Sequence, residues 1–411
     1  IIFFQRRDPR SVWTWLFALN FIPVFGIIFY LLFGQDLKKS RMFKVKGISD
    51  RLNMPVKSQE EIIRSSDIPE EMMDPLIRDF RSLILYNLET SGAVLTTDNQ
   101  VKIYTDGQAK FEGLRTALRR ASRFIHIQYY IIKNDEVFDS IVPILEDKVR
   151  EGVEVRILYD GMGGRFMPKR RWEELRRAGI LVGVFFPPIL GWLNLRVNYR
   201  NHRKIVVIDG NVGFVGGFNI GREYISKDPG FGYWRDTHLR ITGEAVMSLQ
   251  IRFALDWNYA TGENLFKNEA YFRTDLKKKT DGRRDKERPA WPDPELEGSQ
   301  VGMQIIASGP DTREPHIRNN YLELFHKAKH HIYIQTPYFV PDDAIFSALK
   351  MAALSGVDVR LMIPCKPDHP FVYRATCSYA GELLDYGAKV YIYTNGFLHS
   401  KGILVRRPLF L

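Results

Sequence analysis

Two copies of the pattern His-x-Lys are the residues in this chain best suited to chemistry. The first copy is His202 and Lys204, and the second, far along the chain, is His399 and Lys401. Residues two apart on a strand point to the same face, so each pair would present an imidazole and an ammonium group together. Imidazole is a nucleophile that titrates near neutral pH, and the lysine beside it offers positive charge to an anionic oxygen. Two such pairs facing one another would supply a nucleophile and an acid for displacing a leaving group from phosphorus.

The residues after the first pair predict the strand that carries it. Residues 206–208 are β-branched, as a buried strand favours, and Asp209-Gly210 then predict a tight hairpin turn. Asp209 is seven residues beyond His202, an odd number, so an unbroken strand would point it to the opposite face. We therefore expect Asp209 to order the turn or a neighbouring histidine, and not to bind phosphate.

Repetition beyond the two pairs indicates a duplicated unit. A lone His-x-Lys pair is most often just a solvated strand face, but here further segments recur in the same order and at nearly the same spacing. Residues 124–130 match 331–337, residues 151–158 match 355–362, and residues 174–179 match 382–387. The sequence therefore predicts two similar lobes with a single active site at the seam between them.

The elements that must position these residues alternate between strands and helices. Strands are predicted at 124–131 and 153–160, with helices over 108–122, 137–151 and near 244–258. This alternation indicates βαβ units in the α/β class, with parallel or mixed sheets flanked by helices. Upstream, residues 69–88 carry apolar side chains at helical spacing and predict an amphipathic helix.

Residues 13–34 form an uncharged apolar run that predicts a transmembrane helix. The run is long enough to cross a hydrocarbon core of ~30 Å. Basic residues flank both of its ends, so the orientation stays open. The run is too long for a cleaved signal peptide, and no small-residue cleavage site follows it.

Composition narrows the range of partners. A net charge of +11 over 411 residues predicts an anionic partner, either nucleic acid or an acidic membrane surface. The only two cysteines, Cys365 and Cys377, indicate no disulfide framework and are consistent with a reducing, cytosolic location. Residues 185–193 contain two prolines that exclude a helix, and they are either core or a lip that dips into the bilayer.

These features divide the chain into five segments. Residues 266–300 are crowded with charge, glycine and proline, and they predict an exposed linker between the lobes. We expect a transmembrane segment with its flanks (1–40), a juxtamembrane helical region (41–100), a first lobe (101–262), a charged linker (263–300) and a second lobe (301–411).

The motifs together resemble the phospholipase D superfamily and, in detail, the bacterial cardiolipin synthases. The resemblance rests on the paired His-x-Lys motifs, on Gly216-Gly217 and Asn219, and on segments 233–243, 308–311 and 334–343. It implies a catalytic set of His202, Lys204, Asp209, His399 and Lys401, and substrate binding by Gly217 and Asn219. It also implies that His202 is the nucleophile and His399 the acid, which the residues alone leave open.

The resemblance implies a membrane-bound phosphatidyltransferase. Such an enzyme joins two phosphatidylglycerol molecules to give cardiolipin and free glycerol through a phosphohistidine. The implied partners are these lipids and an anionic membrane surface, without nucleic acid, and the implied location is the bacterial cell membrane with the lobes on the cytoplasmic side. No cofactor is implied, and a metal is disfavoured because the lysine beside each histidine would repel a cation.

Other functions stay open on the sequence alone. A phospholipase D-type hydrolase or another phosphatidyltransferase would use the same motifs, as would a superfamily nuclease or an inactive membrane-anchored fragment. In segment 233–238, Asp236 or His238 could orient a catalytic histidine or belong to a buried structural network.

The second copy departs from the first after Val405. Arg406 stands where the repeat predicts an aspartate, and no counterpart of the hairpin return strand or closing helix follows. In the resembled family a further spanning helix precedes the one at residues 13–34. We therefore expect a chain that lacks an amino-terminal segment and has an incomplete second lobe, and we expect this incompleteness to impair its activity.

Overall fold

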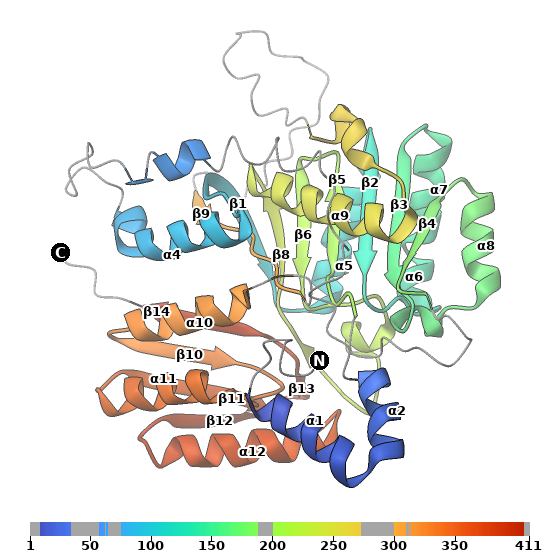
Figure 1. Cartoon of the computed structure of the whole chain (residues 1–411). Helices are drawn as coiled ribbons and strands as arrows, with labels where there is room; N and C mark the ends of the chain where they lie inside the picture. Colours follow the sequence, from blue (N-terminus) through green and yellow to red (C-terminus); the bar gives the residue numbers. More distant parts are fainter. Residues whose placement is uncertain are drawn as a thin grey trace.

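The fold consists of two α/β lobes that lie side by side (Figure 1). It is taken from a computed structural model that describes residues 9–33, 57–61, 63–64, 75–187, 200–272, 300–309, 312 and 314–406.

The first lobe is built on an eight-stranded sheet in the order β4-β3-β2-β5-β6-β8-β1-β9. Strands β2, β3 and β4 are parallel, and the other neighbours are antiparallel. The strands are β1 (Thr96–Tyr104), β2 (Phe124–Tyr129), β3 (Glu154–Asp160), β4 (Leu181–Phe185), β5 (Ile205–Ile208), β6 (Val212–Gly216), β8 (His238–Thr242) and β9 (Val301–Met303).

Helices cover both faces of this sheet, and the apolar run in β5 shows why. Val206 and Ile208 pack with α5 (Gly107–Arg119), α7 (Val142–Arg150) and α8 (Lys169–Arg177). Ile205 and Val207 point the other way, into the cluster under α9 (Ala245–Thr261). A strand that is buried on both faces favours apolar residues at successive positions, as in β5. The predicted helix 137–151 is divided into α6 (Glu136–Asp139) and α7.

The second lobe repeats half of the first sheet. Its four strands run in the order β12-β11-β10-β14, which corresponds to β4-β3-β2-β5. The register agrees as well, because Ile125 pairs with Ile208 in the first lobe and Ile332 pairs with Val405 in the second. The predicted α/β fold of two similar lobes is therefore confirmed. The elements are α10 (His316–Lys327), β10 (His331–Gln335), α11 (Asp343–Leu354), β11 (Asp358–Pro364), α12 (Pro370–Leu384), β12 (Lys389–Tyr393) and β14 (Gly402–Arg406).

A short parallel pair of strands joins the lobes. β7 (Trp234–Arg235) of the first lobe pairs with β13 (Phe397–Leu398) of the second. Phe397 is fully buried in the core of the first lobe. The segment that carries His399 is therefore anchored in the opposite lobe.

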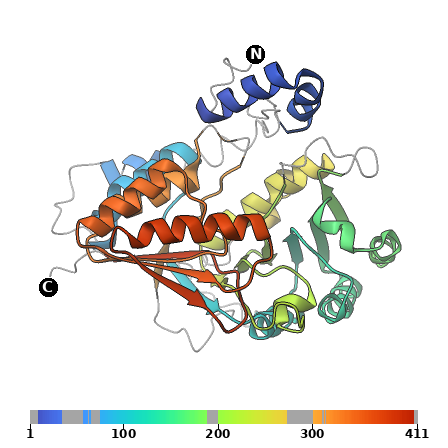
Figure 2. The same ribbon diagram turned by 90° about the horizontal axis from the view of Figure 1, so that it is seen from below.

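The N-terminal apolar run forms two helices where the sequence predicts one. α1 (Pro9–Phe21) ends just before Pro23, and α2 (Pro23–Phe33) begins there; the pair lies to one side of the lobes (Figure 2). Proline has no N–H to donate and its ring clashes with the preceding turn, which breaks a continuous helix. Within the described residues, no helix combines the length and the apolar character that a membrane crossing requires.

Three further sequence predictions meet the structure only in part. The amphipathic helix is α4 (Pro75–Ser91), while residues 69–74 lie outside the described residues. β9 follows the predicted linker but pairs with β1 in the first sheet, so a strand from beyond residue 300 completes the first lobe. Phe185 and Phe186 are buried core residues, and residues 188–193 of the proposed lip lie outside the described residues.

Candidate active site

The structure brings the two His-x-Lys pairs together at the seam between the lobes. His202 and Lys204 immediately precede β5, and His399 and Lys401 lie between β13 and β14. His202 is close enough to Lys401 and His399 for their charges to lower its pKa. The two halves of the duplicated motif therefore lie near one another, and a single active site formed by both stays a prediction.

Each lysine is held in the same way beside its own histidine. Lys204 Nζ donates a hydrogen bond to the carbonyl of His202 at 2.7 Å, and Lys401 Nζ donates to the carbonyl of His399 at 2.8 Å. This repeated contact keeps each ammonium group beside the backbone of its own histidine, and Lys401 Nζ also lies 3.0 Å from His399 Nε2. The two sites are therefore related by an approximate internal symmetry.

A tyrosine ring accompanies each pair, which the sequence analysis did not predict. The Tyr130 ring lies 4.8 Å from the His202 ring, and Lys204 Nζ is 5.4 Å from its centre. In the second lobe the Tyr338 ring lies 6.2 Å from His399, and Lys401 Nζ is 5.7 Å away. Such contacts between ammonium groups and aromatic rings are favourable. The sequence did contain a clue to these tyrosines, because both follow the matched strands β2 and β10.

His399 is positioned by residues of the first lobe. Its Nδ1 donates to the Asp236 carboxylate at 2.6 Å, and its backbone N–H donates to the Arg235 carbonyl at 2.8 Å. Next to it, the hydroxyls of Ser400 and Thr237 are hydrogen bonded at 2.7 Å. Of the two residues considered for orienting a histidine, Asp236 makes this contact.

His238 has a different environment. It is completely buried, next to Phe218, and neither of its ring nitrogens has a hydrogen-bond partner among the described residues. Burial, and then the charge of Lys110, lower the pKa of His238 well below its usual value. His238 is therefore a neutral core residue.

The electrostatics of the site favour neutral imidazole at His202. Desolvation, and then the positive charges of Lys204 and Lys401, lower the pKa of His202 to about 3. Burial also lowers the pKa of Lys204 well below its usual value and that of Lys401 to about 8. Burial lowers the pKa of His399 too, but the hydrogen bond to Asp236 opposes that shift. Asp236 thus favours the protonated form of His399.

Asp209 lies away from these residues, at the far end of β5. Its carboxylate accepts hydrogen bonds from the backbone N–H groups of residues 122–124 and from the Ser122 hydroxyl, at 2.8–3.0 Å. Asp209 and Gly210 both have positive φ, 55° and 73°, as the predicted tight turn requires. The Asp209 carboxylate thus ties the turn to the start of β2, as expected for a residue that orders the turn, and the catalytic role that the resemblance implies stays a prediction.

Gly217 and Asn219 also have structural contacts. A side chain at position 217 would collide with the Asp236 carboxylate, so glycine here lets Asp236 reach His399. The Asn219 amide accepts from the backbone N–H of Ile131 at 3.1 Å and donates to the Tyr224 hydroxyl at 2.9 Å. These contacts hold loops beside the site, and substrate binding by either residue stays a prediction.

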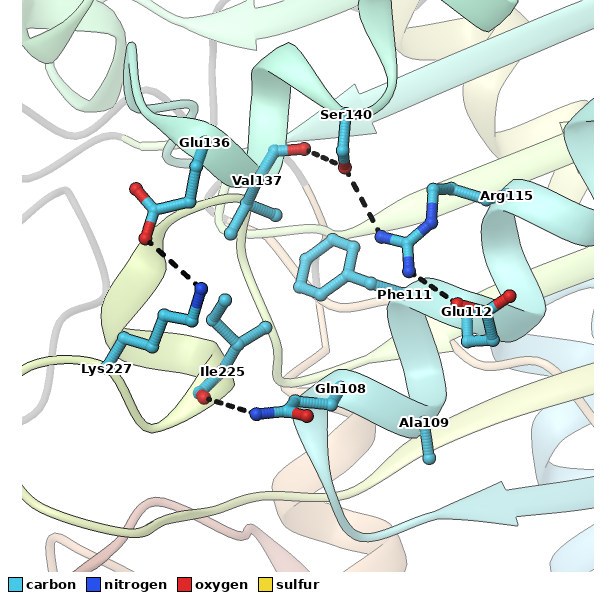
Figure 3. A pocket seen from close by; sticks show the side chains of 10 residues that line it. All are labelled: Gln108, Ala109, Phe111, Glu112, Arg115, Glu136, Val137, Ser140, Ile225 and Lys227. Atoms are coloured by element: carbon cyan, nitrogen blue, oxygen red, sulfur yellow. Dashed lines mark hydrogen bonds and ion pairs between the residues drawn. The ribbon is translucent and has the colours of Figure 1, made fainter.

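A separate pocket of about 600 Å³ opens between α5, α6 and the turn Arg222–Ile225 (Figure 3). Its charged side chains pair with one another, Glu112 with Arg115 and Glu136 with Lys227. None of the predicted site residues lines it. Across the described part of the chain, no group of three or more His, Cys, Asp or Glu side chains is arranged to hold a metal ion.

Two α/β lobes with a His-x-Lys pair at their seam are typical of the phospholipase D-like proteins, and comparison with known proteins agrees with this class. A solved structure of phosphatidylserine synthase from Haemophilus influenzae matches 75% of this chain and 76% of its own length, with a TM-score of 0.50 and 15% identity. This likeness shows a shared fold.

Family and sequence comparisons are more specific. Residues 114–231 and 321–411 match the family described as cardiolipin synthase, PLD-like domain, and residues 1–35 match a phospholipase D-nuclease N-terminal family. Cardiolipin synthase from Oceanobacillus iheyensis is 44% identical over 98% of this chain and 80% of its own length. Cardiolipin synthase from Staphylococcus aureus is 46% identical over 98% of this chain and 78% of its own. The chain belongs to the cardiolipin synthase family of the phospholipase D-like proteins.

Proposed function

We propose that this protein makes cardiolipin from two phosphatidylglycerol molecules, with release of glycerol, at the site between its lobes. Membership of the cardiolipin synthase family makes it a phospholipid phosphotransferase. The observation that carries the mechanism is the pairing of His399 with Asp236, opposite a His202 whose imidazole is neutral near pH 7.

In the first step, an imidazole nitrogen of His202 attacks the phosphorus of one phosphatidylglycerol. A P–N bond forms, and the P–O bond to the headgroup glycerol breaks. The protonated form of His399, which Asp236 favours, gives its proton to the departing glycerol oxygen. Free glycerol leaves, and a phosphatidyl group stays on His202.

In the second step, a headgroup hydroxyl of another phosphatidylglycerol attacks the same phosphorus. His399, now neutral, takes the proton of that hydroxyl as the new P–O bond forms and the P–N bond breaks. Cardiolipin is released, and both histidines return to their starting states. One residue thus serves as acid and then as base.

The two lysines stabilise the charge on the phosphoryl oxygens. Lys204 and Lys401 approach the site from the two lobes, and each lowers the pKa of His202. Two positive groups fixed before the reaction stabilise a developing anion without reorganisation. The rings of Tyr130 and Tyr338 lie 5.4 and 5.7 Å from the ammonium groups of Lys204 and Lys401, respectively.

The N-terminal helices suit attachment to a membrane. Exposed apolar side chains cover both α1 and α2, among them Phe17, Phe21 and Phe25, each more than half exposed. Burial of such surface in lipid is favourable. We therefore propose membrane attachment through residues 13–34. As a separate part of the proposal, the lobes lie on the cytoplasmic side.

Product analysis tests the proposal against its rivals. Purified protein in phosphatidylglycerol vesicles is expected to release glycerol and form cardiolipin in equal amounts. Phosphatidic acid as the main product would indicate a hydrolase instead. Cleavage of DNA that weakens with added salt, without any lipid product, would indicate a nuclease.

A further inference from the structure

Asp256 binds both chain neighbours of His202. It projects from α9 and is completely buried. Its carboxylate accepts a hydrogen bond from Asn201 Nδ2 at 2.8 Å and pairs with Arg203 Nη1 at 2.9 and 3.1 Å. Gln128 of β2 donates to the same carboxylate at 2.7 Å. His202 therefore lies between two residues that are tied to one buried charge.

A second carboxylate holds the same segment from the other side. Asp160, at the end of β3, accepts the backbone N–H of Asn201 at 2.9 Å. The same side chain accepts the backbone N–H of Met162 at 2.9 Å and lies 3.8 Å from the Arg200 guanidinium. Residues 200–203 are thus anchored by the sheet and by α9 together.

The imidazole of His202 is held differently from that of His399. His399 is oriented directly, through the bond from its Nδ1 to Asp236. Among the residues that the structure describes, His202 has a ring contact with Tyr130, and its hydrogen bond to Lys204 involves only the backbone carbonyl. In this part of the chain, the hydrogen bonds that hold the His202 segment thus act on its backbone and on its two neighbours.

We propose that Asp256 is a positioning residue for His202. By fixing Asn201 and Arg203, it sets the backbone so that the imidazole faces the phosphorus of the substrate. This inference rests on the proposed nucleophilic role of His202. If it is correct, the buried Asp256 carboxylate of α9 affects how fast the phosphohistidine forms. The reason is that small misplacement of a reacting atom slows a reaction strongly.

The test compares Asp256→Asn with Glu263→Gln. The Asp256→Asn substitution keeps the size of the side chain but removes the charge that pairs with Arg203. Glu263 is the control for loss of a carboxylate near this end of α9, because it binds Arg156 and Trp257 but neither neighbour of His202. Each full-length variant is assayed with phosphatidylglycerol in mixed micelles for kcat, KM, thermal midpoint and the rate at which phosphohistidine forms.

We expect Asp256→Asn to lower kcat and the rate of phosphohistidine formation by about 10- to 100-fold. KM is expected to stay within about twofold, since the loss falls on the transition state. Glu263→Gln is expected to keep both rates near those of the parent protein. Equal losses of kcat in the two variants, or a loss confined to the thermal midpoint, would overturn the proposal.

A second variant keeps the proposal testable if Asp256→Asn does not fold. Arg203 is partly exposed, so Arg203→Gln removes the same ion pair from its outer end. It must also slow phosphohistidine formation, and the double variant must lose less than the product of the two single losses. Full-rate phosphohistidine formation in Arg203→Gln would contradict the inference. Turnover that persists in His202→Asn would instead contradict the proposed function.

Discussion

Asp236 of the first lobe and Nδ1 of His399 from the second lobe are joined by a hydrogen bond of 2.6 Å. A carboxylate in this position favours imidazolium, and so it supports the acid role of His399. We expect Asp236→Asn to lower kcat by about 100-fold. Activity that requires protonated His399 is lost as pH rises through its pKa, so this alkaline limb should move to lower pH in the variant.

A pH profile of kcat measures that shift. Asp228→Asn is a suitable control, because Asp228 lies in the same connecting segment and its carboxylate accepts a local hydrogen bond from the backbone N–H of Gly230. An alkaline limb that stays in place in Asp236→Asn would show that His399 is not the acid.

Substitution of His202 and substitution of His399 are expected to impair the reaction in different ways. His202→Asn removes the nucleophile, so no phosphohistidine should form and kcat should fall by more than about 10³-fold. His399→Asn keeps the nucleophile but lacks the acid, so phosphohistidine should form slowly. Quenched-flow experiments with labelled phosphatidylglycerol distinguish the two, and labelling of His399 instead of His202 would reverse the assignment.

Lys401 predicts a second feature of the pH profile. Burial lowers its pKa to about 8, so its positive charge is present below that pH and is lost as pH rises through it. In Lys401→Arg the charge persists to much higher pH. We expect the variant to retain activity above that pH better than the parent, relative to its own maximum. Parallel declines of the two enzymes there would rule out a role for this charge.

Gly217 is expected to tolerate no side chain. Alanine there would collide with the Asp236 carboxylate and displace it from His399. We expect Gly217→Ala to reduce kcat by at least about tenfold while the far-ultraviolet circular dichroism is kept. Gly381→Ala is the control, because it lies in α12 with open space around it. Equal activity of the two variants would show that the close approach has no catalytic consequence.

Asp209 is expected to affect stability and not the chemical step. Asp209→Ala leaves the buried backbone N–H group of Phe124 and the partly buried ones of Ser122 and Arg123 without this acceptor, which should cost about 3 kcal/mol in the free energy of unfolding. Urea denaturation measures this loss, and Asp209→Asn should recover part of it. A kcat of the folded Asp209→Ala protein reduced as strongly as in His202→Asn would contradict the structural role.

Much of the fold follows from local patterns in the sequence. The β-branched run at 206–208 and the Asp209-Gly210 turn predict β5 and its hairpin, because alternation and turn geometry act over a few residues. The repeated segments predict two lobes, because segments of similar sequence adopt similar folds. Where two local signals compete, the stronger decides: the apolar run at residues 13–34 suggests one helix, but Pro23 divides it.

Residue type and spacing alone were enough to single out His202, Lys204, His399 and Lys401 as the candidate site residues. The surroundings of these residues became visible once the chain was folded. Asp236 reaches His399 across the seam, Asp256 reaches the neighbours of His202 from α9, and Tyr130 and Tyr338 lie against the two imidazoles. These partners are far apart in the chain, and their approach depends on how sheets and helices pack, which no local pattern specifies.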